Sequence, residues 1–110
     1  MCFLGLQNLS NAELVNFQDE AHLLEHFTKH ASEWGNKYLN PEQYLKSAND
    51  LLNRVGSGIS QFTSSQGWLF KYDANLNEFL LVSPVGTIST YFRPVEGFEY
   101  WLKQVEIYGG

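Results

Sequence analysis

Cysteine is nearly absent from this sequence, since Cys2 is the only one in 110 residues. A single cysteine excludes an intramolecular disulfide and a cysteine-rich structural metal site. No apolar stretch approaches the ~20 residues that a membrane-spanning helix needs. The apolar segment Met1–Leu6 is too short and too weakly flanked for a secretory signal. We therefore expect a soluble domain that works in the reducing environment of a cytoplasm.

Basic residues are also scarce, with seven Lys and Arg against twelve Asp and Glu and a formal net charge of −5. The seven are scattered and form no run. Affinity for nucleic acid comes largely from neutralised phosphates, so this composition counts against binding to a duplex. A nuclease of this composition needs its few cations to converge on one cleft.

Apolar and aromatic residues, by contrast, are plentiful, at 44% and 15% of the chain. These fractions provide a packed core and argue against disorder, which goes with few aromatics and high charge. The length fits one domain, and no repeat or low-complexity tract divides it. We expect residues 1–110 to form a single domain.

The first half of the chain carries helical signals. After Asp19, apolar residues recur at helical spacing and Gly35 is suited to end the helix. Asn40-Pro41-Glu42 predicts the start of a second helix, which ends at Gly56-Ser57-Gly58. A weaker helix start is found at residues 10–13. The predicted apolar stripe of the first helix is Leu23, Leu24, Phe27, Ala31 and Trp34.

The second half changes to short aromatic or β-branched runs at 68–72, 78–83 and 87–92, separated by hairpin-length turns. From Phe98 onward, Trp101, Leu102 and Val105 predict a final amphipathic helix. The predicted fold class is therefore α+β, with N-terminal helices packed on one face of an antiparallel meander of three to four strands, followed by a short C-terminal helix.

The three histidines, His22, His26 and His30, lie four residues apart and so share one face of the first helix. This face is not the apolar stripe, so we expect these side chains to avoid the core. They are either a solvated polar face or groups that transfer protons near neutral pH. His22-Leu-Leu-Glu-His26 also matches an inverted zinc-peptidase pattern, but such a site needs a third protein ligand, and the pattern arises easily by chance.

Other candidate residues surround His30 and the last predicted strand. Lys29 precedes His30 and offers a cation to a phosphate. Strand alternation places Ile88, Thr90 and Phe92 on one face, and Thr87, Ser89 and Tyr91 on the other. The Thr90 hydroxyl needs a partner, either a backbone carbonyl or a phosphate oxygen. Arg93 at the strand end is suited to clamp a phosphate.

Four ordered blocks of the sequence carry a family resemblance. They are His26-Phe-Thr-Lys-His-Ala-Ser-Glu-Trp-Gly35, Tyr44-Leu-Lys-Ser-Ala48, Tyr72-Asp-Ala-Asn-Leu-Asn-Glu-Phe79 and Gly86-Thr-Ile-Ser-Thr-Tyr-Phe-Arg-Pro94. Together they resemble the superfamily named for barnase, EndoU, colicin D and RelE, and within it the toxin domains of polymorphic and contact-dependent growth inhibition systems. The likeness runs from about residue 23 to 101.

The resemblance implies a metal-independent endoribonuclease without a cofactor, which cuts RNA, expected to be tRNA, by 2′-OH attack and leaves a 2′,3′-cyclic phosphate. It implies His30, Thr90, Lys29 and His26 as catalytic residues, and Arg93, Lys71 and Ser89 as phosphate contacts. It further implies a monomeric effector, secreted or delivered into the cytoplasm of a target cell and neutralised by an immunity protein. A catalytically inactive toxin-like module that binds a partner through its acidic surface is the main alternative, and a small zinc peptidase is a weaker one.

Overall fold

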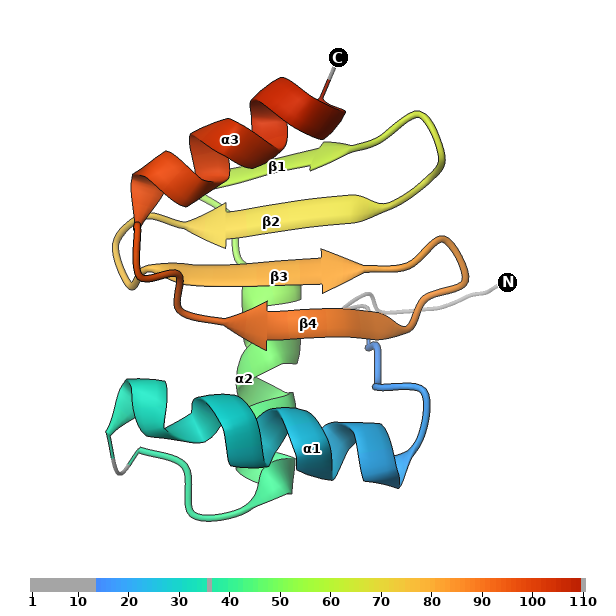
Figure 1. The fold of residues 1–110 in the computed structure, drawn as a ribbon, viewed down its shortest axis with the longest axis vertical. Coiled ribbons are helices and arrows are strands. Elements are labelled where there is room, and N and C mark those ends of the chain that lie inside the picture. Colours follow the sequence, from blue (N-terminus) through green and yellow to red (C-terminus); the bar gives the residue numbers. More distant parts are fainter. Residues whose placement is uncertain (1–13, 36, 110) are drawn as a thin grey trace.

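The computed structural model describes residues 14–35 and 37–109 (Figure 1). Their elements, in chain order, are α1 (Glu20–His30), the 3-10 helix η2 (Ala31–Trp34), α2 (Pro41–Asn53), β1 (Ile59–Thr63), β2 (Leu69–Asp73), β3 (Glu78–Val82), β4 (Ile88–Phe92) and α3 (Phe98–Tyr108). This arrangement confirms the predicted α+β class. The helix start predicted at residues 10–13 lies outside the described residues.

Both N-terminal helices begin where the sequence pattern predicted, and α2 begins at its predicted cap, Asn40. The side chain of Asp19 accepts a hydrogen bond from the backbone N–H of His22, and that of Asn40 accepts one from the backbone N–H of Gln43. Each cap satisfies a backbone donor that the helix itself leaves unpaired. α1 does not continue to Gly35 as a regular helix, because its last turn tightens into η2, a common way for a helix to end.

The four strands pair antiparallel in the order β1-β2-β3-β4, which is the predicted meander. β1 is the strand that the sequence pattern did not locate, because Ser60 and Gln61 interrupt its apolar residues. α2 lies behind the sheet, α3 crosses the opposite face near β1, and α1 lies along the edge strand β4 (Figure 1). Within the described ranges, no helix is both long enough and apolar enough to cross a membrane.

The two faces of the sheet carry separate cores, named here the α2 face and the α3 face. The buried core of the α2 face is formed by Phe17, Leu23, Tyr38, Tyr44, Ala48, Leu51, Leu80, Val82, Ile88 and Tyr91. The buried core of the α3 face is formed by Phe70, Tyr72, Phe79 and Trp101. The C-terminal helix thus covers the face that the N-terminal helices leave open.

A β-bulge at Ser89 changes which side chains of β4 share a face. Leu81 pairs with Thr90, but Val82 pairs with Ile88, so Ser89 has no partner on β3. The extra residue shifts the alternation by one. Ile88 therefore belongs to the α2 face, and Thr90 lies with Leu81 on the α3 face. The predicted grouping of Ile88 with Thr90 was wrong because simple alternation does not include a bulge.

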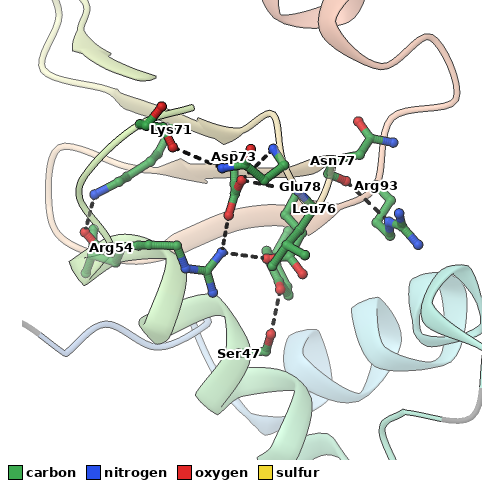
Figure 2. A network of polar contacts seen from close by, with 12 residues as sticks. Ser47, Arg54, Lys71, Asp73, Leu76, Asn77, Glu78 and Arg93 are labelled. Carbon is green, nitrogen blue, oxygen red and sulfur yellow. Dashed lines mark hydrogen bonds and ion pairs between the residues drawn. The ribbon is translucent and has the colours of Figure 1, made fainter. Parts of the chain in front are cut away.

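A network of buried charges joins the C-terminal end of α2 to the β2–β3 hairpin (Figure 2). Nη1 of Arg54 lies 2.7 Å from Oδ2 of Asp73 and 3.1 Å from Oε1 of Glu78. The indole of Trp34 donates to the other oxygen of Glu78 at 2.8 Å, so η2 joins the same network. This network joins η2 and the C-terminal end of α2 to the sheet.

Candidate active site between α1 and the edge strand

The histidine face of α1 is more buried than the sequence predicted. His22 is exposed, but His26 and His30 are half-buried, and the side chain of His30 is only 12% exposed. The expectation that these residues avoid packed surroundings was wrong for His26 and His30, because α1 contacts α2 on one side and β4 on another. Leu24, predicted to lie in the apolar stripe, is 54% exposed instead.

His30 is held by a carboxylate. Its Nδ1 lies 2.7 Å from Oε2 of Glu33, one turn further along the chain. Its ring centroid lies 5.5 Å from that of Phe92 at the end of β4. Nε2 makes no hydrogen bond within the described part of the chain. Since a carboxylate accepts the Nδ1 proton, it fixes the ring orientation and leaves Nε2 for proton exchange.

Glu33 is itself fixed by the residue that follows β4. Its Oε1 accepts the backbone N–H of Arg93 at 2.8 Å, and its backbone carbonyl accepts from Nη1 of Arg93 at 3.2 Å. Nε of Arg93 donates to the carbonyl of Asn77 at 3.4 Å (Figure 2). Arg93 therefore lies close to the His30–Glu33 pair, and its role as a phosphate contact stays a prediction. Two of its three guanidinium nitrogens serve the structure, and Nη2 makes no hydrogen bond to the described residues.

His26 is the second imidazole of the site. Its ring centroid lies 5.9 Å from that of His30 and 5.0 Å from that of Phe17. Its Nδ1 is buried and has no hydrogen-bond partner among the described residues. Burial lowers the pKa of His26, and the nearby charges of His30 and Lys29 lower it further. His26 is therefore biased towards the neutral form, which accepts a proton.

A surface groove of about 220 Å³ lies beside His26, between α1 and the turn that joins β3 to β4. It is lined by Phe17, Gln18, His22, His26, Trp68, Ser83, Thr87, Ile88 and Ser89. The predicted residues His26 and Ser89 thus share one groove, which we call the His26 groove. The exposed ring of His22 at its rim is hydrogen-bonded to Asp19 at 2.8 Å, and this bond raises the pKa of His22.

Thr90 lies between the two imidazoles along the strand. α1 and β4 run in the same direction (Figure 1), with His26 beside the start of β4 and His30 beside Phe92 at its end. The side chain of Thr90 is half-buried on the α3 face, on the same side as that of Phe92. No hydrogen bond joins Thr90 to His30 in the described ranges. A catalytic role of Thr90 stays a prediction.

The two candidate lysines lie in different surroundings. Lys29 is exposed next to His30 in the chain, and its charge acts on His26. Lys71 is only 2% exposed, and its Nζ donates to the backbone carbonyl of Leu52 at 2.7 Å. The prediction that Lys71 contacts phosphate is therefore wrong, because its amino group is buried and bound to a backbone carbonyl. Strand alternation directs this side chain towards the end of α2, away from α1.

Glu33 is the site residue that the sequence analysis missed. Its signal was present, because a glutamate three residues after His30 shares its side of a helix. The spacing of four between the histidines does not reveal this pair, whose members are three residues apart. The contact with Arg93 had no comparable signal, since the two residues are 60 positions apart.

The comparisons with known proteins give no family. No model of a known protein family matches the chain, and no curated protein matches its sequence. Within residues 14–35 and 37–109, no group of three or more His, Cys, Asp or Glu side chains is placed to hold a metal ion.

Proposed function

We propose that this chain is a metal-independent endoribonuclease domain that uses His26 and His30 as its proton-transfer pair. The observation that carries the proposal is that the rings of His26 and His30 have different surroundings. His30 is oriented by Glu33 at 2.7 Å, while His26, 5.9 Å away, has a lowered pKa. The buried ring of His26 is biased towards the neutral form, which accepts a proton, and the His30 ring, held through Nδ1, presents Nε2 as a proton donor.

In this proposal the two imidazoles act on opposite sides of one phosphate. Neutral His26 takes the proton of the ribose 2′-OH, and the 2′-oxygen attacks the neighbouring phosphorus. Protonated His30, held through Nδ1, donates from Nε2 to the leaving 5′-oxygen as the P–O5′ bond breaks. The products are a 2′,3′-cyclic phosphate and a free 5′-OH. DNA lacks the attacking hydroxyl and is not a substrate.

Negative charge on the phosphate rises during attack and needs donors already in place. Lys29 and Nη2 of Arg93 are the cationic groups near the two imidazoles, and the Thr90 hydroxyl on β4 is a neutral donor. Few cations are available elsewhere on an acidic chain. The substrate is therefore a short exposed segment of RNA rather than a duplex, and a tRNA loop is the form we expect.

The biological setting follows from the four sequence blocks. They support a toxin domain that is delivered into a target cell, acts in its cytoplasm as a monomer, and is neutralised in the producing cell by an immunity protein. The acidic balance of the chain favours a second candidate, a catalytically inactive domain of the same kind that only binds a partner.

One assay tests the proposal. Total tRNA is incubated with the wild type, with His30→Ala and with a surface control, Lys103→Ala, each with and without EDTA. We expect chelator-resistant cutting that leaves a 2′,3′-cyclic phosphate, unchanged in the control and reduced about 10²–10⁴-fold in His30→Ala. Cutting that EDTA abolishes, or that survives His30→Ala, overturns the mechanism. No cutting by the wild type favours the inactive binding domain.

A further inference from the structure

We propose that the His26 groove binds one nucleoside of the RNA, the nucleoside on one side of the bond that is cleaved. This inference rests on the proposed ribonuclease function and deepens it by assigning a substrate subsite. It follows from the position of the groove, from the chemistry of its lining and from the bulge at Ser89.

The groove reaches one member of the proposed proton-transfer pair. His26 lines it, and His30 lies one turn of α1 further on, at a ring separation of 5.9 Å. A helical turn advances ~5.4 Å. The phosphate attached to a nucleoside in the groove therefore lies within about one helical turn of His30. A nucleoside bound here therefore places the adjoining phosphate between the two imidazoles.

The lining suits a base and a sugar better than a phosphate or an apolar peptide. Trp68, His22 and His26 provide flat ring surfaces. The other polar lining residues, Gln18, Ser83 and Thr87, provide amide and hydroxyl groups. Proteins recognise single unstacked bases by stacking on aromatic rings and by hydrogen bonds to the base edges. No Lys or Arg is among the described residues that line the groove, so the phosphate is left to the neighbouring site.

The bulge gives the groove a hydroxyl that is free to select a base. Ser89 has no cross-strand partner on β3, its side chain is exposed, and its hydroxyl makes no hydrogen bond to any residue in the described ranges. Bulges occur preferentially next to active sites, where they redirect a side chain. Because a hydroxyl both donates and accepts, Ser89 is suited to read the edge of a base.

The size of the groove limits the ligand to one nucleoside. Its volume of about 220 Å³ is below the ~300–1,000 Å³ that is usual for drug-sized ligands. Two stacked bases need more room than this. The groove therefore selects a single base, and specificity for further nucleotides has to come from elsewhere on the RNA.

The three tryptophans allow a binding test that does not depend on catalysis. Trp68 lines the groove, whereas Trp34 donates to Glu78 and Trp101 is buried on the α3 face. In NMR titrations with each of the four nucleoside 3′-monophosphates, we expect the indole N–H signal of Trp68 and the ring signals of His22 and His26 to shift. The indole signals of Trp34 and Trp101 stay in place.

Two serine variants test selection of the base. Ser89→Ala is expected to weaken binding of the preferred nucleotide about fivefold to tenfold, the effect of one net hydrogen bond. Ser65→Ala, an exposed serine in the β1–β2 turn, is the matched control and leaves binding unchanged. Equal effects of the two variants overturn the role of Ser89.

The outcomes separate this inference from the ribonuclease proposal. If the wild type cuts RNA but Trp68 does not respond to any of the four nucleotides, the groove is not the nucleoside site and the inference fails. If Trp68 responds and no RNA is cut, the groove binds a nucleoside, but the catalytic proposal fails and with it the assignment of the groove to a cleaved bond. Equal shifts of all three indole signals indicate nonspecific binding and overturn the inference.

Discussion

At the scale of single residues, Glu33 creates the difference between His26 and His30. The Nδ1 of His30 has a carboxylate at 2.7 Å, whereas the buried Nδ1 of His26 has no partner among the described residues. Two rings on one helix face, one turn apart, thus meet different surroundings. Their separate roles in the proposed reaction depend on this asymmetry, and it can be removed by one substitution.

Glu33→Gln is expected to lower kcat about 10- to 100-fold with little change in KM, because a hydrogen bond to a charged group contributes ~1.5–3 kcal/mol. Glu33 acts through His30, so it is a positioning residue and its loss acts mainly on the transition state. Steady-state kinetics on tRNA give the kcat and KM, and ¹⁵N NMR gives the tautomer of His30.

Glu99→Gln, an exposed change on α3, is the matched control for Glu33→Gln and leaves both quantities unchanged. An unaltered His30 tautomer in Glu33→Gln would contradict the positioning role, even if activity fell.

The two histidines with shifted pKa values also predict opposite effects of pH on stability. The pKa of His26 is lowered in the folded state, mainly by burial. The unfolded chain then binds the proton more readily, so stability is full above the unfolded pKa of ~6.5 and falls as the pH falls towards the folded pKa. His26→Phe removes this loss and flattens the fall of the unfolding free energy between pH 7.5 and 5.5, measured in urea.

His22 provides a control of opposite sign. Its pKa is raised by the hydrogen bond to Asp19, so its contribution to stability is present below ~6.5 and is lost as the pH rises through the folded pKa. His22→Gln therefore steepens the fall towards pH 5.5. The same pH profile in both variants would contradict the opposite shifts.

At the scale of the elements, the sequence predicted the features that depend on local signals. Asp19 and Asn40 were placed at helix starts because a cap is defined by a few neighbouring residues. Three of the strands were found from apolar runs. β1 was not, because Ser60 and Gln61 obscure its pattern and the pairing with β2 decides its structure.

The site was predicted only in part, for a physical reason. The histidines were found from their spacing, but their burial depends on how α1 lies against β4, which no local pattern records. The bulge at Ser89 is decided by the register with β3. The direction of Lys71 is decided by the end of α2, where a carbonyl accepts its amino group.

The junction of α2 with the β2–β3 hairpin predicts a large effect of one substitution. Arg54→Met leaves the carboxylates of Asp73 and Glu78, 2% and 1% exposed, without this partner. Breaking a buried ion pair costs ~3–5 kcal/mol, and we expect the lower end because the Arg54 side chain is 28% exposed. Urea unfolding measures the loss.

Lys46→Met tests the same change at the surface. Lys46 pairs with Asp50 on the exposed side of α2, where such pairs contribute ~0.3–0.5 kcal/mol. A loss in Arg54→Met as small as in Lys46→Met would show that the buried network does not hold the hairpin to α2.

At the scale of the whole molecule, the net charge of −5 limits how the chain holds RNA. Lys71 and Arg54 are occupied by internal contacts, so Lys29 and Arg93 are the cations beside the proposed site. Two neutralised phosphates predict a slope of about −1.4 for log K against log salt on single-stranded RNA. Fluorescence anisotropy with an uncleavable 2′-O-methyl oligonucleotide, titrated at KCl concentrations from about 50 to 200 mM, measures this slope.

A slope steeper than about −4 would require about six or more phosphate contacts. It would mean that RNA follows a basic surface other than the edge of β4, and it would contradict the location of the site. A weak dependence on salt, together with measurable cutting, supports a short single-stranded substrate.

The order of the strands has a consequence for how quickly the chain folds. Each strand pairs with the one that follows it, so every hairpin closes over a short stretch of backbone and the sheet grows from neighbour to neighbour. Local pairing of this kind lowers contact order and speeds folding relative to sheets built from distant segments. Such connectivity allows the sheet to form again rapidly after complete unfolding.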